Sequence, residues 1–420
     1  MSGPRRKLSI LLLCDDDKRH ANTLLEHIEA FRRYSAHDVR TFNPRSLKRS
    51  SILDLGEFDV VIIHYSLCII ADEYLAPDFR EKLRRYKGLK IQFIQDDYRW
   101  VDRITAMMRY VGIHVLFTLV PTAEIPKVWS EDRLPGVVKI NTLAGYVPEN
   151  EAGVSGCPLE RRPIHVGYRG RELPFWIGRL GQEKARIAQG MLARAAGYGL
   201  RCDIAWREKD RIYGQAWNRF LSSCRATLGT ESGASITDFD GSIERRVKDY
   251  LARHPTADFE EVHGEILWEF EDNVRMNVIS PRIFEAIALR TALVLFPGEY
   301  SRVIHPGEHY MLLRKDFSNM DEVVERLRHI GELKAMTERA YRDVVQSDRY
   351  SLRSFIREFD EVVVEYAEPY GKTGKVRFQA AQIEKVARIK VRFQAAQIEK
   401  AARNQFGGIV DWVEGSRKRV

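Results

Sequence analysis

The sequence predicts an α/β protein with two Rossmann-like domains that face each other across a cleft, followed by a helical C-terminal extension. Three observations support this fold class. Short apolar runs alternate with helical patterns in the first part of the chain, a stretch rich in Gly, Pro and Glu follows at 144–163, and the alternation starts again at residue 164. Such alternation is typical of a doubly wound parallel sheet, and its restart indicates a second domain.

The first domain is expected at residues 1–148. Its opening run, LSILLLC, is followed by the helical pattern HANTLLEHIEAFRRY. Each later apolar run stands between helical or loop segments, as the buried strands of a parallel sheet do. Strands are therefore predicted at 8–14, 59–65, 90–95 and 114–120.

The second domain is expected at residues 149–340, with closing helices at 341–370. Its first strand, IHVGYRG, runs into a turn, and a helical pattern with a further strand follows. An acidic and aromatic stretch at 238–275 interrupts the alternation and is predicted to be a helical insertion. The other elements expected in this domain are strands at 164–170 and 201–206, a helix at 181–199, a helix that starts at 280, and apolar runs at 291–296 and 309–314.

The composition excludes several classes of protein. The 420 residues are 44% hydrophobic and 30% charged, which is ordinary for a globular chain. No apolar run approaches the roughly 20 residues that a membrane-spanning helix needs. Three aspartates follow the apolar start at once, so we expect a first buried strand rather than a signal peptide. The five cysteines are scattered without disulfide or zinc spacing, which favours a reducing cytoplasm.

The positive charge is concentrated at the end of the chain. Residues 371–420 hold 12 Lys and Arg against 4 Asp and Glu, whereas residues 1–370 hold 55 of each kind. The body is therefore formally neutral, and net charge gives no support for nucleic-acid binding. The tail repeats KVRFQAAQIEK, at 375–385 and again at 390–400, with an apolar stripe at helical spacing. Two interpretations stay open: an amphipathic helix on an anionic membrane or partner helix, or a solvated charged helix without a partner.

The stretch VISPRIFEAIALRTALVLF, at 278–296, predicts a helix mouth next to a buried strand. Ser280 is expected to cap free amides, and Pro281 suits the first turn. Free N–H groups and the helix dipole make such a mouth an anion site. Arg282 is predicted to add a bidentate grip on phosphate, and Glu285 to bind a vicinal diol such as a ribose. The alternative is that Ser280 only caps the helix while Arg282 and Glu285 form a solvated pair.

A second cationic turn follows the strand predicted at 164–170. Arg169 lies between Gly167 and Gly170, and Arg171 comes next. Two guanidinium groups on a turn at the carboxyl edge of a sheet, in a neutral body, indicate a phosphorylated ligand. Surface arginines near turns are common, so this motif alone leaves the ligand open.

Four segments together resemble the CgeB-like group of GT-B glycosyltransferases: GYRGRELPFWIGRLGQEK, TESGASITDFDG, SPRIFEAIALRTALVLFPGEYS and HPGEHYMLLRKDFSN. The resemblance covers about residues 8–367. It implies that the second domain holds a nucleotide-diphosphate-sugar donor and that the first holds the hydroxyl acceptor. It also suggests surface polysaccharide or glycan assembly, for which a lipid-linked acceptor and a peripheral membrane tail would suit the basic repeat. The donor-binding candidates are Tyr168, Arg169, Arg171, Ser280, Arg282 and Glu285.

The sequence departs from the pattern of many GT-B enzymes at two places. They carry a second glutamate eight positions before the ribose-binding one, where this chain has Asn277. They also have glycine shortly after the helix, where this chain has Arg290 and Thr291. The donor sugar and its contacts are therefore left open. A catalytically inactive nucleotide-sugar-binding or scaffolding protein of the same fold is the alternative function.

Two polar loops follow predicted strands of the first domain and are expected to open on the cleft. CDDDKRH places three aspartates and His20 after the first strand, and IQDDYRW places Asp96 and Asp97 after another. A base that deprotonates an acceptor hydroxyl must reach it within hydrogen-bond distance. Asp97 and His20 are the candidates if the reaction inverts the anomeric centre. The structural alternative is that these aspartates form turns and cap helices.

Two other functions share parts of this pattern. The carboxylates of Asp15, Asp16 and Asp17 suit Mg²⁺ or Mn²⁺ in a metal-dependent transferase, but those enzymes have one α/β domain. No metal or cofactor is expected, because a helix mouth and arginines can neutralise a leaving diphosphate. The same loop also resembles the acidic pocket of a phosphoacceptor receiver domain. That domain needs an aspartate at the end of a later strand, where this chain has His64.

Overall fold

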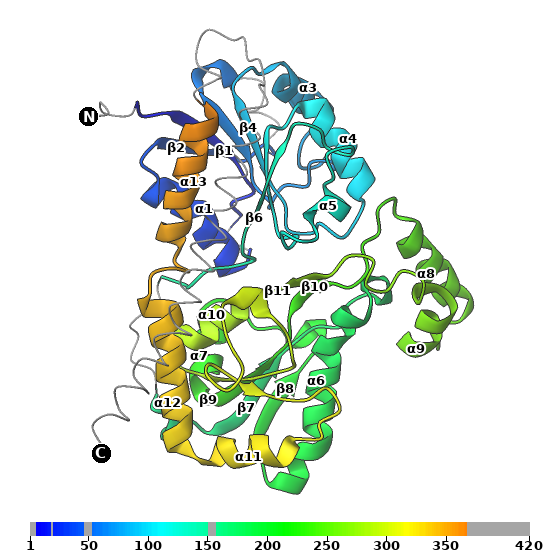
Figure 1. Ribbon diagram of the computed structural model, residues 1–420, viewed down its shortest axis with the longest axis vertical. Helices are drawn as coiled ribbons and strands as arrows, with labels where there is room; N and C mark the ends of the chain where they lie inside the picture. Colours follow the sequence, from blue (N-terminus) through cyan, green and yellow to red (C-terminus); the bar gives the residue numbers. More distant parts are fainter. Residues whose placement is uncertain (1–5, 18–19, 46–52, 150–156, 368–420) are drawn as a thin grey trace, which may run out of the picture. The chain divides into compact units, whose positions relative to one another are not determined.

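The computed structural model describes residues 6–17, 20–45, 53–149 and 157–367 (Figure 1). The repeat expected to form an amphipathic tail at 371–420 lies outside these ranges. Within them the strands form two larger parallel sheets, one from each predicted domain. None of the helices in these ranges is both long and apolar enough to cross a lipid bilayer.

The first sheet has six parallel strands in the order β2-β1-β3-β4-β5-β6. The four predicted strands are confirmed, and the structure adds β2 and β6, whose polar sequences gave no clear strand pattern. Residues of β3, β4 and β5 are buried throughout, as expected where helices cover both faces of a sheet. The bounds are β1 Ser9–Leu13, β2 Asp38–Phe42, β3 Val60–Ile63, β4 Leu89–Phe93, β5 Val115–Thr118 and β6 Val138–Asn141.

Helices cover both faces of this sheet (Figure 1). Alternate residues of β1 point to opposite faces, so Ile10 and Leu12 belong to one hydrophobic cluster and Leu11 and Leu13 to the other. The first cluster includes residues of α1 and α13, and the second includes residues of α3, α4 and α5. These helices are α1 Asn22–Tyr34, α3 Pro77–Arg85, α4 Val101–Val111, α5 Ile125–Val128 and α13 Leu352–Ala367.

The second sheet has five parallel strands in the order β13-β12-β9-β7-β8. Its carboxyl edge is the place where a doubly wound sheet binds ligands, and β7 ends at Arg169. The strands are β7 Ile164–Arg169, β8 Cys202–Ala205, β9 Cys224–Gly229, β12 Ala292–Leu295 and β13 Met311–Leu312. The helices are α6 Arg179–Ala195, α7 Gly214–Ser223, α10 Pro281–Ala288, α11 Met320–Arg328 and α12 Ile330–Ala340.

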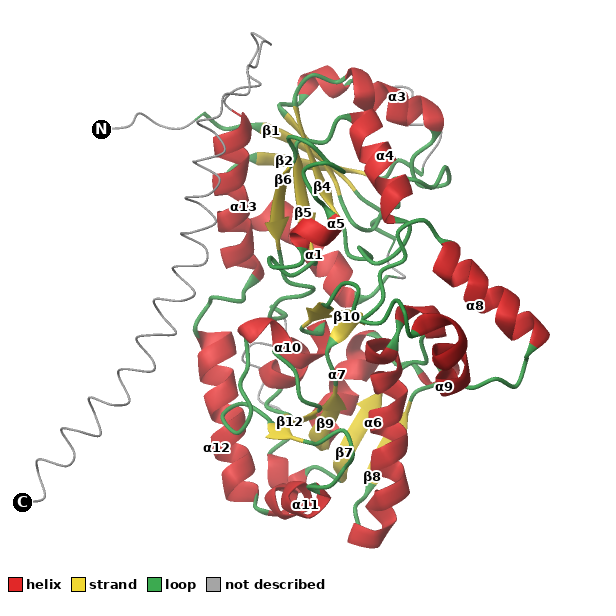
Figure 2. Cartoon of the chain, turned by 45° about the vertical axis from the view of Figure 1, so that its right-hand side comes forward, coloured by secondary structure: helices red, strands yellow, loops and turns green. Residues whose placement is uncertain are grey.

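The expected helical insertion is present between two short antiparallel strands, β10 Ser232–Ala234 and β11 Met276–Val278 (Figure 2). It consists of α8 Ser242–Arg253, α9 Phe259–Val262 and a π-helical turn, His263–Leu267. After α12, a second π-helical segment, Tyr341–Gln346, leads into α13. Because Phe355 and Phe359 of α13 pack with β1 and β4 residues, the chain ends its described part on the first sheet.

Candidate active site

Helix α10 begins where the sequence predicted a helix mouth. Ser280 has extended backbone angles, φ −76° and ψ 140°, and Pro281 occupies the first turn. The buried residues Ile283, Phe284 and Ile287 anchor the helix in a core cluster, so the predicted apolar face is confirmed. The Ser280 side chain makes no cap hydrogen bond. The cap expected at Ser280 is therefore absent. Pro281 has no N–H, and the Ile283 amide donates to the Ser280 carbonyl at 3.0 Å, so the first turn offers few free amides to an anion.

The end of β7 meets this helix mouth, as the sequence required. Nη1 of Arg282 donates a hydrogen bond to the carbonyl oxygen of Arg169. The Arg169 side chain, however, turns to β8: Nη2 lies 2.8 Å from Oδ1 of Asp203, and the guanidinium lies 4.3 Å from the centre of the Phe220 ring. Its charge is therefore already neutralised. The main chain of this turn contributes to the site, whereas the Arg169 guanidinium does not reach for a ligand.

Three other cations gather at the helix mouth. Lys184 of α6 has its pKa lowered to about 8 by burial and by the charges of Arg282 and Arg171. Arg171 is exposed. Among the residues that the structure describes, neither Lys184 nor Arg171 has a carboxylate partner, and the neighbouring Glu183 is paired with Lys315 instead. The positive charges repel one another, and an anionic ligand bound between them would relieve this repulsion.

Lys184 was missed in the sequence, although it ends the motif GRLGQEK. Helix α6 starts at Arg179, soon after β7, so its first two turns lie at the carboxyl edge of the sheet. This position near the carboxyl edge was the feature of the sequence that could have identified Lys184 as a site residue. Tyr168, a predicted donor contact, is 5% exposed and belongs to the core cluster of β7. Burial raises its pKa to about 12, and its place is beneath the site rather than at its surface.

Glu285 lies one turn into α10 and is held by Trp217 of α7. Nε1 of Trp217 donates to Oε2 of Glu285 at 2.7 Å, and the Arg282 guanidinium lies 5.5 Å from the Trp217 ring centre. Burial raises the pKa of Glu285, while the Trp217 hydrogen bond and the Arg282 charge oppose the increase. Oε1 has no hydrogen-bond donor within the described part of the chain. It is therefore oriented and ready to accept a hydrogen bond from a ligand hydroxyl.

The asparagine that stands in place of a second glutamate has a carboxylate as its partner. Nδ2 of Asn277 donates to Oε2 of Glu231 at 2.7 Å, and the Tyr300 amide donates to Oε1 at 2.7 Å. Glu231 comes from the segment TESGAS and is 4% exposed. The structure thus brings a carboxylate to this region from another strand end, which the spacing within one segment could not indicate.

Asp97, the first candidate base, is inaccessible. It is 0% exposed, and its carboxylate accepts hydrogen bonds from the hydroxyl of Thr118, the amide of Leu119 and the indole of Trp129. Burial raises its pKa to about 7, against the effect of these hydrogen bonds. An acceptor hydroxyl has no path to this group. Asp97 fastens the ends of β4 and β5 to the segment after α5.

His20, the second candidate, contacts Asp15. Its Nε2 lies 3.2 Å from Oδ2 of Asp15, which also pairs with Arg45 at 2.7 Å. Burial would raise the pKa of Asp15, but hydrogen bonds from Arg45, His20 and Asn43 outweigh it and hold the pKa below its ordinary value. The described residues contain no group of three or more side chains arranged to hold a metal ion.

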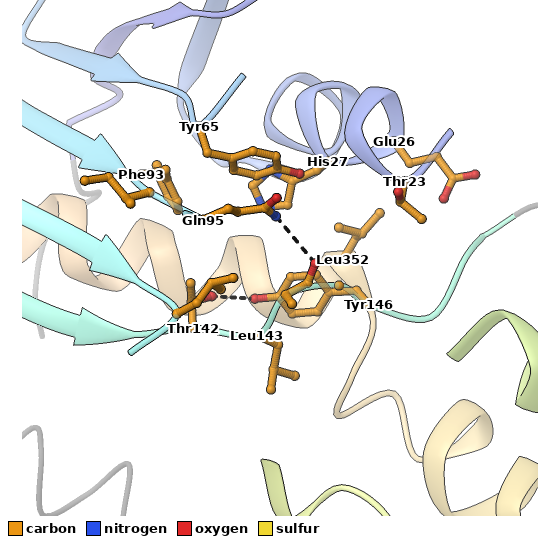
Figure 3. Close-up of a pocket in the computed structure, with 14 residues that line it drawn as sticks. Thr23, Glu26, His27, Tyr65, Phe93, Gln95, Thr142, Leu143, Tyr146 and Leu352 are labelled. Carbon is orange, nitrogen blue, oxygen red and sulfur yellow. Dashed lines mark hydrogen bonds between the residues drawn. The ribbon is translucent and has the colours of Figure 1, made fainter. Parts of the chain in front are cut away.

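A pocket lies at the carboxyl edge of the first sheet (Figure 3). Its cavity volume is about 20 Å³, which is enough for about one water molecule. The loop after β6 forms one wall, and a Cβ at Gly145 would lie 2.7 Å from Cβ of Pro281. Glycine therefore lets this wall touch the first turn of α10. The lining residues are Thr23, Glu26, His27, Tyr65, Phe93, Ile94, Gln95, Leu119, Thr142, Leu143, Ala144, Gly145, Tyr146 and Leu352.

Glu26 of α1 stands at the rim of this pocket (Figure 3). Burial raises its pKa to about 7, and the negative charges of Glu285 and Glu149 contribute. The influence of Glu285 shows that the carboxylates on α1 and α10 are within electrostatic reach of each other. Nothing in the sequence around Glu26, which is one charge on an amphipathic helix, distinguishes it from its neighbours.

No family model and no curated protein sequence matches the chain. Among solved structures, an alpha-glucosyltransferase in complex with UDP-glucose and DNA containing an abasic site matches with a TM-score of 0.55 and 8% sequence identity. The alpha-glucosyltransferase AGT in complex with UDP gives 0.54 and 9%. Both matches cover 86% of this chain and 100% of the other. Anabaena HepE in complex with UDP-glucose gives 0.46 and 9%, covering 85% and 100%.

At these identities the likeness concerns the fold alone. The CgeB-like group therefore stays a resemblance in the motifs. The match covers 86% of this chain and the full length of each alpha-glucosyltransferase. The chain has the two-domain α/β fold of the GT-B glycosyltransferases.

Proposed function

We propose that the protein is a glycosyltransferase that moves a sugar from a nucleotide-diphosphate donor to a hydroxyl group of an acceptor. One observation carries the proposal: Lys184, Arg171 and Arg282 share the mouth of α10 without a carboxylate partner among the described residues. A diphosphate matches this site in charge and in its need for hydrogen-bond donors. The fold shared with glycosyltransferases supports the same assignment.

The donor is proposed to bind with its nucleoside toward Glu285. The free Oε1 of Glu285 accepts hydrogen bonds from the ribose diol, while Trp217 holds the other oxygen. Glu231, oriented by Asn277 and the Tyr300 amide, is the candidate for the donor sugar's hydroxyls. Each group is held by a protein partner before the ligand arrives, which lowers the cost of ordering on binding.

The chemistry required of the protein is to stabilise the departing diphosphate. Negative charge develops on the diphosphate oxygen as the bond to the sugar breaks, and preorganised cations and amides act most strongly on such developing charge. Lys184 and Arg282 supply this stabilisation in the proposed mechanism. No metal ion is required, since these groups already neutralise the leaving group.

The acceptor is proposed to bind on the first domain. Solved neighbours include complexes with DNA, but the formally neutral body of this chain gives no support for a phosphate-backbone acceptor. A role in polysaccharide or glycan assembly is the narrower proposal, and it rests on the resemblance in the motifs.

Calorimetry with UDP and UDP-glucose tests the proposal, because the solved neighbours are complexes with these ligands. We expect binding that is weakened in Lys184→Met and Arg282→Ala. Release of UDP from UDP-glucose then separates an enzyme from the alternative, a nucleotide-sugar-binding protein without activity. If neither UDP nor other nucleoside diphosphates bind, or if both variants bind as tightly as the native chain, the assignment of the site is wrong.

A further inference from the structure

The amino ends of three strands of the second sheet carry basic side chains that donor binding does not use. His165 is the second residue of β7, and Arg225 is the second residue of β9. The two residues lie side by side, because the β7–β9 residue pairs before and after them are in register. Arg201 directly precedes β8, which pairs with β7 on the other side. The two arginines therefore flank His165.

A third arginine reaches the same place from helix α11, which lies at this end of the sheet (Figure 1). Arg328 is the last residue of α11, and its Nη2 donates to the carbonyl oxygen of Tyr198, in the short turn between α6 and β8, at 2.9 Å. Burial lowers the pKa of His165, and the charges of the three arginines lower it further. All three guanidinium groups are therefore within electrostatic reach of the imidazole. We call His165, Arg201, Arg225 and Arg328 the amino-edge cluster.

The hydrogen bonds of His165 leave two donors facing each other. The amide of Arg201 donates to Nδ1 of His165 at 3.1 Å. An amide can only donate, so Nδ1 is unprotonated and the neutral ring carries its proton on Nε2. Nε2 lies 3.5 Å from Nη2 of Arg201, which is also a donor. Neither atom can accept from the other, and an oxygen that accepts from both would satisfy them.

The amino-edge cluster lacks a counter-charge in the part of the chain that the structure describes. Carboxylates of neighbouring elements have other partners: Glu160 pairs with Lys334 at 2.9 Å, and Asp321 accepts a hydrogen bond from the Tyr198 hydroxyl at 2.6 Å. None of the three arginines forms an ion pair with a carboxylate within the described ranges. Nε of Arg225 is shielded from solvent and has no acceptor there either. The positive charges therefore repel one another, and an anion would relieve this repulsion.

Protein contacts hold the arginines in place before a ligand arrives. Nη2 of Arg225 donates to the carbonyl oxygen of Glu160 at 3.4 Å, and Arg328 is held by the turn after α6. A guanidinium has five N–H groups, so most of these donors stay available. His165 and Arg225 are half-buried, whereas Arg201 and Arg328 are exposed. The cluster is therefore ordered by the fold and open to solvent on one side, which lowers the cost of ordering on binding.

The donors of the cluster suit a phosphate monoester. Such a group carries about −1.5 to −2 charges at neutral pH and has three strong acceptor oxygens, whereas a carboxylate has one charge and two oxygens. Arginine binds phosphate through paired N–H groups in a fixed geometry. Three guanidinium groups and one imidazole N–H therefore match a phosphate monoester better than a carboxylate in both charge and number of donors.

The amino-edge cluster is separate from the donor site. Strand β7 begins beside the cluster and ends at Arg169, whose carbonyl oxygen accepts the hydrogen bond from Arg282. At about 3.3 Å per residue in a parallel strand, the backbone from His165 to Arg169 spans about 13 Å. An anion at the cluster would therefore leave the mouth of α10 free for a diphosphate.

We propose that the amino-edge cluster is a second anion site, which binds the phosphate monoester group of a soluble molecule or of a lipid headgroup. Nε2 of His165 and the Arg225 guanidinium donate to its oxygens from the sheet edge, and Arg201 and Arg328 donate from the exposed side. The site goes beyond the proposed glycosyl transfer and does not depend on it.

Calorimetry with inorganic phosphate tests the site. The full chain with Lys184→Met is the starting protein, so that the cation proposed for the donor diphosphate does not contribute. We expect one saturable binding event, weakened roughly 10-fold or more in Arg201→Gln and in Arg328→Gln, the scale of one charged hydrogen bond. Arg326→Gln is the matched control, because Arg326 lies on the same helix and pairs with Glu322 at 3.8 Å; it should bind phosphate as the starting protein does.

Sedimentation with vesicles distinguishes the two sources of the phosphate. Phosphatidic acid presents a monoester and phosphatidylglycerol a diester, each in a phosphatidylcholine background. The basic segment at 371–420 contributes equally in all variants. A loss of sedimentation in Arg328→Gln, but not in Arg326→Gln, with phosphatidic acid alone assigns a lipid headgroup. Equal sedimentation of both variants, with phosphate binding in solution, assigns a soluble ligand.

Three results would overturn the site. They are the absence of saturable phosphate binding, unchanged affinity in both Arg201→Gln and Arg328→Gln, and an equal loss of affinity in the control Arg326→Gln. The affinity of the otherwise native chain for UDP should stay the same in Arg328→Gln, because the donor site lies at the other end of β7. Failure of UDP to bind any variant would instead refute the proposed function and leave the phosphate result standing.

Discussion

Replacing Lys184 by Met tests the donor site through a property that only a half-buried cation without an ion-pair partner has. The side chain keeps its length and apolar stem but loses its charge. In the free protein the pKa of Lys184 is lowered to about 8, because of burial and of the positive charges of Arg282 and Arg171. A diphosphate between these cations would stabilise the ammonium form and raise the pKa again.

The size of the effect follows from the pKa difference. The fall from the ordinary 10.5 to about 8 corresponds to roughly 3 kcal/mol, at 1.36 kcal/mol per pKa unit. At pH 8 about half of the Lys184 side chains are protonated in the free protein, and nearly all are protonated in the complex. UDP binding at pH 8 should therefore take up roughly half a proton per site, and affinity should fall as pH rises above 8. Loss of one charged hydrogen bond, about 1.5–3 kcal/mol, should weaken UDP binding roughly 10- to 150-fold.

Calorimetry in buffers of different ionisation enthalpy measures both quantities. The native chain should show proton uptake at pH 8 that is much smaller at pH 6.5, and Lys184→Met should show weak binding without uptake. Lys334→Met is the control, since Lys334 is exposed and pairs with Glu160 at 2.9 Å. Native affinity in Lys184→Met, or the same proton uptake in both proteins, would show that Lys184 does not contact the diphosphate.

Three further results are expected. Glu285→Ala should weaken UDP binding by about 1.5–3 kcal/mol, measured by calorimetry; unchanged affinity would remove Glu285 from the site. Asp97→Ala should lower the free energy of unfolding by at least about 2 kcal/mol, since three buried donors lose their acceptor. The kcat per folded molecule should stay near the native value. A fall in kcat of about 10²-fold or more without loss of stability would restore Asp97 as a candidate base. Excess chelator should leave transfer unchanged, and a loss reversed by Mg²⁺ or Mn²⁺ would disprove the metal-free mechanism.

The parts of the fold that follow from short-range pattern were predictable. Leu11 to Leu13 and Val60 to Ile63 are continuous apolar runs, and a strand buried on both faces needs such a run. Ser280 followed by Pro281 marks a helix start by local geometry. Strand β2, by contrast, is polar and half-buried at the sheet edge. An edge strand is stabilised by pairing with its neighbour, and this leaves little trace in its own sequence.

The location of the site could be predicted from the sequence, but most of the residues that form it could not. The carboxyl edge of a parallel sheet is a property of topology, so the loops at Arg169 and Ser280 were expected to converge, and the Arg282 hydrogen bond joins them. Lys184 and Glu231 acquire their roles from partners far along the chain. Asn277 orients Glu231 from 46 residues away.

Arg169 and Lys184 show why a charged residue near a strand end is a weak predictor of function. By sequence Arg169 is the stronger candidate, because it stands between two glycines as the last residue of β7. Asp203 on the adjacent strand neutralises it, so its charge holds β7 to β8. Lys184 lies on a helix among ordinary polar residues, yet two like charges and burial depress its pKa. What marks a binding cation is the missing counter-charge, and that depends on which residues the fold brings beside it. Asp203→Asn should therefore free the Arg169 guanidinium and tighten UDP binding in calorimetry if Arg169 can swing to the diphosphate; unchanged affinity would show that its role is confined to joining the strands.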